Sequence, residues 1–261
     1  RNRTSPMAFT GNKFEFRMLG SSQSISGPNI ALNTIMAKEL NEFASQLEDS
    51  KNFQADLQKL IKKVFTDHQR IIFNGNGYDE SWVKEAEKRG LDNLISTSDA
   101  LPHYASKKNV DLYVSNGIYT EEELQARSLI HVETYNATIS IEARTMADMI
   151  RREILPAVSS YATDLAGRVT ALKGAGVSAK YESETLKKVS TLTDALADTC
   201  DKLSKDLEKV PEDATKAMNY YHKTILSDMA KAREEADALE TLTDEEYWPF
   251  PVYSDLLFSE N

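Results

Sequence analysis

Cysteine is almost absent from this chain of 261 residues, and histidine is scarce. The single cysteine, Cys200, excludes an internal disulfide framework and fits a reducing compartment such as the cytoplasm. The four histidines lie far apart, without an i,i+4 pair or a cysteine partner, which argues against a zinc site. No uninterrupted apolar run is long enough to cross a bilayer, so we expect no membrane-spanning segment.

The chain also has fewer basic than acidic side chains. The chain carries 31 Lys and Arg against 41 Asp and Glu, a formal net charge of −10, which argues against nucleic acid as a partner. Arg1, Arg3, Lys13 and Arg17 nevertheless gather at one end of the sequence. A local basic cluster on an acidic background is expected where a phosphate group binds.

Most of the sequence has helical periodicity, with apolar residues three and four positions apart. Thr120 and Glu123 form a capping-box pattern, and from there we expect helix almost to the end. Pro156 lies inside the first long helix of this part and is expected to kink it. Earlier helices are predicted over about 29–48, 53–67 and 81–89 and around residue 101, and later breaks at 174–176 and 210–211.

Three amphipathic helices with brief connections predict an antiparallel bundle. We therefore predict a mainly α protein, with a short N-terminal β segment, covering helices and a long bundle, divided into residues 1–137 and 138–261. The aromatic residues 247–258 contain prolines and would expose much apolar area as a free tail. We expect this tail to dock on the body of the protein or on a neighbouring subunit.

Residues 13–18 alternate between charged and apolar side chains, as a half-buried β-strand does. Lys13, Glu15 and Arg17 would share one face of this strand. A carboxylate between two cations stays ionised at neutral pH and suits a divalent metal flanked by anionic ligands. The same pattern fits a solvated surface strand, and the residues alone leave both interpretations open.

Five segments carry a resemblance to a known family: residues 2–6 (NRTSP), 13–17 (KFEFR), 70–78 (RIIFNGNGY), 141–143 (IEA) and 247–251 (YWPFP). They resemble segments of glutamine synthetase, especially of the long type III class with its extended helical C-terminal part. The first two segments are specific for chemistry, and the other three are specific only for the class. The resemblance implies part of an ATP-dependent glutamate–ammonia ligase, in which glutamate is phosphorylated on its side chain and ammonia displaces the phosphate. It also makes the β segment the last part of the catalytic barrel, and residues 1–137 part of the catalytic domain.

The resemblance assigns roles to four residues. Glu15 would be a ligand of Mg²⁺ or Mn²⁺, and Arg17 a catalytic residue that binds glutamate or the transferred phosphoryl group. Arg3 would be a second catalytic residue, which binds ATP and neutralises charge as the γ-phosphate moves. Lys13 would contact nucleotide phosphate where an arginine is usual, a weaker fit because guanidinium binds phosphate in bidentate fashion.

The resemblance further implies glutamate, ammonia and ATP as substrates and self-association into a double-ring homo-oligomer in the cytoplasm. We interpret the chain as the C-terminal portion of such an enzyme, unable to turn over alone. The alternative is a non-catalytic helical scaffold or interaction module whose N-terminal strand pairs with a partner. The three periodic helices support that alternative equally well.

Overall fold

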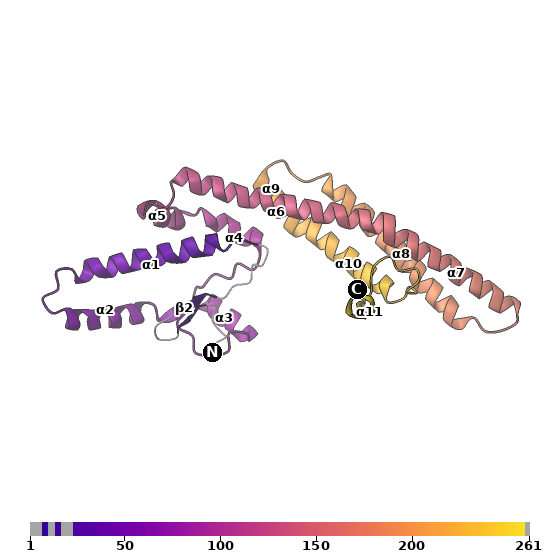
Figure 1. The fold of residues 1–261 in the computed structure, drawn as a ribbon, viewed down its shortest axis with the longest axis horizontal. Helices are drawn as coiled ribbons and strands as arrows, with labels where there is room; N and C mark the ends of the chain where they lie inside the picture. Colours follow the sequence, from indigo (N-terminus) through magenta and orange to yellow (C-terminus); the bar gives the residue numbers. More distant parts are fainter. Residues whose placement is uncertain (1–6, 10–13, 17–22, 259–261) are drawn as a thin grey trace. The chain divides into compact units, whose positions relative to one another are not determined.

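The computed structural model describes residues 7–9, 14–16 and 23–258 (Figure 1). The chain divides into two compact units, Arg1–Ser128 and Leu129–Asn261, called unit 1 and unit 2 below. The division lies inside the long helix α6 (Glu121–Met149). The described residues are mostly helical, which confirms the predicted fold class at that level.

Unit 1 begins with a small β-sheet. Strand β1 (Met7–Phe9) pairs antiparallel with β2 (Phe14–Phe16), and Ala8 lies opposite Glu15 in the register. The β segment expected over residues 13–18 is therefore described only over 14–16, as one strand of a two-stranded sheet. The described part of the chain forms no barrel, so membership of a catalytic barrel stays a prediction.

Helices make up the rest of unit 1, close to the positions that the periodicity predicts. Helix α1 packs against α2, which follows it after a short connection, and also against α5. The bounds are α1 (Ser26–Leu47), α2 (Phe53–Asp67), the 3-10 segment η1 (Gln69–Ile71), α3 (Glu80–Lys88), α4 (Thr97–Tyr104) and α5 (Lys107–Ser115).

Short polar side chains begin three of these helices. The side chains of Asn52, Asp79 and Ser96 each accept a hydrogen bond from a backbone N–H of the first turn. Such bonds satisfy donors that have no partner inside the helix. Gly90 follows α3 with φ of +71°, a left-handed conformation that glycine adopts easily. The predicted end of that helix at Gly90 is confirmed.

Unit 1 buries few large side chains. Among its described residues, Leu60 and Leu124 are the buried apolar ones. Thr34 and Ser98 are buried as well, and Thr34 Oγ1 donates to the carbonyl oxygen of Ile30 at 2.7 Å. Local hydrogen bonds therefore carry much of the order in this unit.

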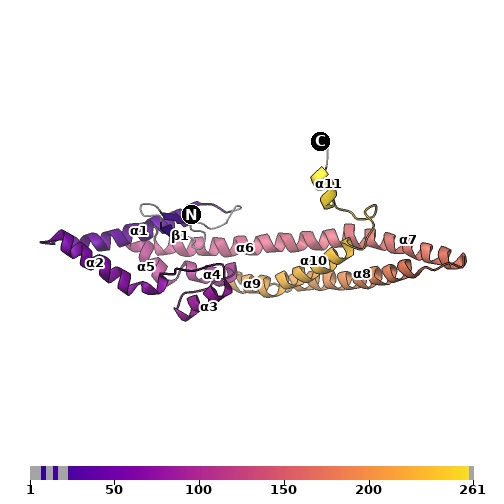
Figure 2. The ribbon, with the colours of Figure 1, turned by 90° about the horizontal axis from the view of Figure 1, so that it is seen from below.

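Unit 2 is a helical bundle, as predicted. The chain runs out along α6, η2 and α7, returns along α8, and continues through α9, η3 and α10 (Figures 1 and 2). Helix α8 packs closely against both α7 and α10. The bounds are the π-helical η2 (Ile150–Ile154), α7 (Leu155–Gly174), α8 (Lys180–Leu207), α9 (Ala214–Tyr220), the π-helical η3 (Tyr221–Ile225), α10 (Leu226–Glu240) and α11 (Tyr253–Phe258).

The core of unit 2 consists of the apolar positions that recur every three or four residues. The predicted breaks agree with the structure, because α7 ends at Gly174 and α8 ends shortly before residues 210–211. None of the described helices is both long and apolar enough to cross a membrane. Core residues that are almost fully buried include Val158, Leu165, Val189, Leu196, Cys200, Leu203, Ile225, Ala232 and Leu239.

Pro156 has a local effect on the first long helix. Because proline has no N–H, it cannot donate to the carbonyl four residues earlier, at Arg152. The turn directly before it is π-helical, and the N–H of Leu155 donates to the carbonyl oxygen of Ile150. Ile150 and Ile154 both remain buried, so the π-helical turn keeps the helix packed on the core while it accommodates the proline.

The aromatic segment after α10 packs on unit 2. Tyr247, Trp248 and Phe250 lie against the core, and the rings of Tyr247 and Tyr161 are 5.4 Å apart between centroids. The expectation that this segment docks on the body is confirmed for these residues. Helix α11 follows, and its apolar side chains are exposed.

Candidate functional site

The predicted site residues lie at the edge of what the structure describes. Arg3, Lys13 and Arg17 fall outside the described residues. Glu15 lies in β2, opposite Ala8, and is described by its backbone alone. The structure therefore shows that Glu15 belongs to a paired strand, and the four predicted roles stay predictions.

The described residues contain no group of three or more His, Cys, Asp or Glu that could hold a metal ion. A metal at Glu15 would need further ligands, because Mg²⁺ and Mn²⁺ prefer several oxygen ligands. The described chain alone therefore does not fit a complete metal site.

Cys200 is a core residue. It is fully buried on α8, and its Sγ lies 3.6 Å from the carbonyl oxygen of Ala147 on α6. Burial raises the pKa of the Cys200 thiol. A buried thiol with a raised pKa is a poor nucleophile, which argues against a catalytic role for Cys200.

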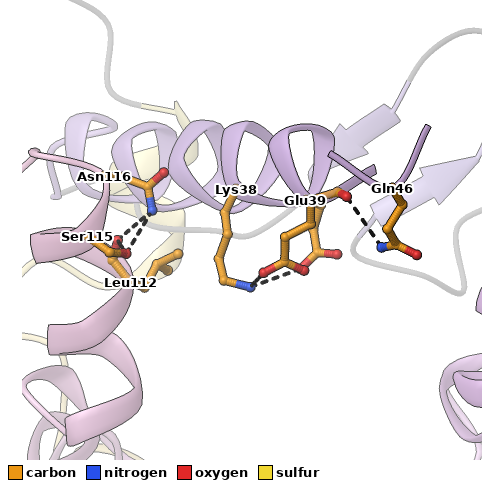
Figure 3. Close-up of polar contacts among 7 residues, drawn as sticks. Lys38, Glu39, Gln46, Leu112, Ser115 and Asn116 are labelled. Atoms are coloured by element: carbon orange, nitrogen blue, oxygen red, sulfur yellow. Dashed lines mark hydrogen bonds and ion pairs between the residues drawn. The ribbon is translucent and has the colours of Figure 1, made fainter. Parts of the chain in front are cut away.

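The polar groups on α1 and α5 do not converge on a common point. Figure 3 shows Lys38 beside Glu39 on α1. Lys38 Nζ also lies 2.6 Å from Oε1 of Glu42 on the same helix. The Glu42 hydrogen bond raises the pKa of Lys38. Asn116, at the end of α5, donates to the carbonyl oxygen of Leu112 at 2.8 Å. Each of these bonds joins groups that belong to one helix, an arrangement typical of a solvated surface.

Arg89 holds the turn within residues 70–78, a contact that the sequence alone does not predict. Arg89 Nη1 donates to the carbonyl oxygens of Arg70 and Ile72 at 3.3 and 3.0 Å, and its Nε donates to Glu85 at 2.7 Å. Its guanidinium also lies 5.5 Å from the ring centroid of Trp82. The only sequence signal was the i,i+4 spacing of Glu85 and Arg89.

Phe73 and Gly75 complete this turn. The rings of Phe73 and Trp82 stack with centroids 3.9 Å apart. A Cβ atom added at Gly75 would lie 2.6 Å from the Phe73 ring, so a side chain at this position would displace the ring. The turn is therefore a packed structural element, and nothing in it identifies a ligand.

Two buried carboxylates form an ion network between α8 and α10 in unit 2. Lys202 Nζ lies 2.9 Å from Asp206 Oδ2 and 2.5 Å from Asp228 Oδ1, and Lys209 Nζ lies 2.7 Å from Asp206 Oδ1. Hydrogen bonds from Lys209 and Lys202 lower the pKa of Asp206 to about 2. Because the lysines already neutralise both carboxylates, this network joins two helices and does not offer a metal site.

A hollow of about 680 Å³ opens between α6–η2 and α10 in unit 2. Its walls carry Met146, Met149 and Met229, and the docked side chains of Trp248 and Phe250 line it as well. The sequence gives no sign of this hollow, because amphipathic periodicity marks a buried face without showing where two helices stand apart.

Comparisons with known proteins agree with the resemblance described above. The model of the glutamine synthetase C-terminal domain family matches residues 56–173. A glutamine synthetase of Butyrivibrio fibrisolvens is 35% identical over 99% of this chain, and a type-3 glutamine synthetase of Dictyostelium discoideum is 36% identical over 99%. A glutamine synthetase of Bacteroides fragilis (strain YCH46) is 32% identical over 100% of the chain.

The chain spans much less than the full length of these relatives. It covers 38% of the Butyrivibrio protein and 37% of each of the other two. The match falls in their C-terminal part. By sequence, the chain is thus related over its whole length to the C-terminal part of glutamine synthetases, including the type-3 class.

Proposed function

We propose that this chain is the C-terminal part of an ATP-dependent glutamate–ammonia ligase, which makes glutamine through a γ-glutamyl phosphate intermediate. The observation that carries the proposal is the identity of 35% to a glutamine synthetase over 99% of the chain, which includes the β1–β2 sheet and both units. The relatives are longer, so the remaining parts of the active site would come from other regions of the complete enzyme.

In this proposal the N-terminal segment provides the chemistry. Glu15 helps to hold Mg²⁺ or Mn²⁺, and Arg17 binds the glutamate substrate or the transferred phosphoryl group. Arg3 and Lys13 face the phosphates of ATP. Phosphoryl transfer depends on positioning and on charge stabilisation at the phosphoryl oxygens, which is what one carboxylate and three cations can support.

The sheet β1–β2 supports this assignment because a paired strand is a rigid position for a site residue. Backbone pairing between Ala8 and Glu15 fixes the register of Glu15. We propose that this sheet belongs to a catalytic barrel in the complete enzyme, with residues 1–137 in the catalytic domain and 138–261 as the bundle.

We further propose that the complete enzyme is a cytoplasmic double-ring homo-oligomer and that unit 2 contributes to its assembly. Support comes from the family resemblance and from the exposed apolar side chains of α11, including Leu256 and Phe258. The net charge of −10 supports the expectation that nucleic acid is not a partner.

The test is substitution in the complete enzyme. Glu15→Gln and Arg17→Ala should each lower the rate of glutamine formation by at least about 100-fold, because each removes charge stabilisation from the reacting groups. Glu87→Gln is the matched control, since Glu87 is an exposed carboxylate on α3 in the same unit. Analytical ultracentrifugation should show unchanged assembly for all three variants.

Retention of activity in both Glu15→Gln and Arg17→Ala would favour the alternative, a non-catalytic helical scaffold or interaction module. The 261-residue chain by itself should form no glutamine from glutamate, ammonia and ATP. Glutamine formation by this chain alone would show that the assignment as a part of the enzyme is wrong.

A further inference from the structure

The hollow in unit 2 has the composition of a surface that binds a helix. It lies between α6–η2 and α10, and its volume of about 680 Å³ can receive several large side chains. Met146, Met149 and Met229 form its walls. Methionine side chains are flexible and polarizable, so a wall of methionines adapts to apolar groups of different shapes.

The side chains that line this hollow, called the groove from here on, explain why it stays open. Ala232 and Ala236 of α10 lie at the floor, and their small side chains leave space that a larger residue would fill. The docked aromatic side chains of Trp248 and Phe250 contribute to the lining. The groove is therefore a formed feature of the bundle, with an apolar interior and a defined lining.

Charged residues at the groove have a net negative charge. Glu142, Asp237 and Glu240 line it together with one cation, Arg233. Arg233 Nε is already bound to Asp237 Oδ1 at 2.5 Å. Among the residues that the structure describes, Glu142 and Glu240 have no ion-pair partner. Two carboxylates therefore remain available beside an apolar, methionine-lined surface.

We propose that this groove binds an amphipathic helix of a partner protein whose polar face carries Lys and Arg. Apolar side chains at positions i, i+4 and i+7 of the partner would enter the methionine-lined interior. Its cations would pair with Glu142 and Glu240 at the groove edge. This interaction goes beyond the proposed ligase function and does not depend on it.

A second copy of this chain fits the groove less well. The exposed apolar residues of α11, Leu256, Leu257 and Phe258, are the obvious candidates for insertion. Asp255 directly precedes them, however, and no Lys or Arg follows Arg233 in the sequence. Insertion of this tail would bring like charges together, so the charge of the groove favours a different, cationic chain.

The binding test uses the 261-residue chain with Trp82→Phe, so that Trp248 at the groove is its remaining tryptophan. The probe is a synthetic peptide of about 16 Leu and Lys residues, with Leu at positions that share one helix face. The control peptide has the same composition in an order that spreads Leu around the helix. The patterned peptide should shift the Trp248 emission and bind at least about tenfold more tightly than its control.

Charge reversal then locates the binding surface. The double variant Glu142→Lys with Glu240→Lys should weaken peptide binding at least about tenfold. The matched control is Glu208→Lys with Glu212→Lys, which changes the net charge equally at exposed positions of unit 2 outside the groove. This control should weaken binding by less than about threefold at physiological salt.

Equal weakening in the two double variants would overturn the proposal, because binding would then follow net charge alone. Equal binding of the two peptides would overturn it as well. A third contrary result would be self-association of the chain that depends on its concentration. It would count against the proposal if two double variants each abolished it: Glu142→Lys with Glu240→Lys, and Leu256→Ser with Phe258→Ser. That result would assign the groove to a second copy of the chain.

Discussion

Unit 1 and unit 2 are both helical, but they are stabilised in different ways. Unit 2 surrounds a continuous core in which Leu196, Leu203 and Leu239 have no exposed surface. Unit 1 has only Leu60 and Leu124 as buried apolar side chains among its described residues. Amphipathic helices in unit 2 bury one another, while several helices of unit 1 depend more on caps and local bonds.

The exposed surface of unit 1 also distinguishes it from unit 2. Large apolar side chains on α1 and α2, including Ile35, Leu40, Ile61 and Phe65, are about half exposed or more. Contiguous exposed apolar surface often marks a place where more protein packs. Unit 2 therefore buries its own core, whereas unit 1 leaves apolar surface against which further protein can pack.

The largest expected effect comes from the core of unit 2. Leu203→Ala should lower the free energy of unfolding of this unit by about 3 kcal/mol, because it leaves a cavity among fully buried side chains. Leu40→Ala in unit 1 should cost less than about 0.5 kcal/mol, since Leu40 is 59% exposed. Each unit contains one tryptophan, so urea unfolding can be followed separately by Trp248 and by Trp82.

In a Trp82→Phe background the tryptophan fluorescence reports only on unit 2, and in a Trp248→Phe background it reports only on unit 1. Leu57→Ala, a half-buried position on α2, gives an intermediate control within unit 1. Similar losses for Leu203→Ala and Leu40→Ala would contradict the difference between the units, because they would indicate an equally packed core in both.

The ion network of unit 2 should give the next largest effect. Lys202→Met removes the cation that lies between Asp206 and Asp228, two carboxylates with little exposed surface. The expected loss is about 2 kcal/mol, less than for a fully buried pair because Lys202 itself is solvated. Unfolding followed by Trp248 measures it, and Lys205→Met on the same helix is the matched control.

This network also predicts a pH dependence. The folded-state pKa of Asp206 is lowered to about 2 from an ordinary value of 3.8, so its contribution is complete above pH 3.8 and is lost as pH falls toward 2. The pKa values of Lys202 and Lys209 are raised, so their contribution is lost only as pH rises through values above 10.5. Asp206→Asn should reduce the slope of stability between pH 4 and 2; an unchanged slope would exclude Asp206 as its source.

The sequence predicted those features that depend on neighbouring residues. The capping box at Thr120, the helix end at Gly90 and the break at Gly174 all follow from local chemistry and agree with the structure. Helical periodicity also identified the core positions of α7, α8 and α10, because a bundle of long helices needs little more information.

Features that depend on distant residues could not be predicted in this way. The pairing of Lys202 with Asp228 joins two helices, and the Arg89 contacts with Arg70 and Ile72 cross a turn. The π-helical η3 has no proline to mark it. The role of Glu15 came from family resemblance, since alternation in a strand fits a site and a solvated surface equally well.

The smallest expected effect concerns the cap of α6, which lies in unit 1. Thr120 Oγ1 accepts a hydrogen bond from the N–H of Glu123 at 3.1 Å, and Glu123 Oε2 accepts one from the N–H of Thr120 at 2.9 Å. Thr120→Ala should cost about 1 kcal/mol, and Thr120→Ser should restore most of it because the hydroxyl is retained. Hydrogen exchange of the first-turn amides measures the change.

Glu122→Gln is the matched control for this cap, because Glu122 lies in the same turn outside the capping box and should change exchange little. Equal losses in Thr120→Ala and Thr120→Ser would contradict a role for the hydroxyl. The comparison with Leu40→Ala is the sharper result. If unit 1 depends on local bonds, Thr120→Ala lowers its free energy of unfolding more than Leu40→Ala does, although Thr120→Ala removes far fewer atoms. In unit 2 the opposite order is expected, with loss of a leucine side chain the more costly change.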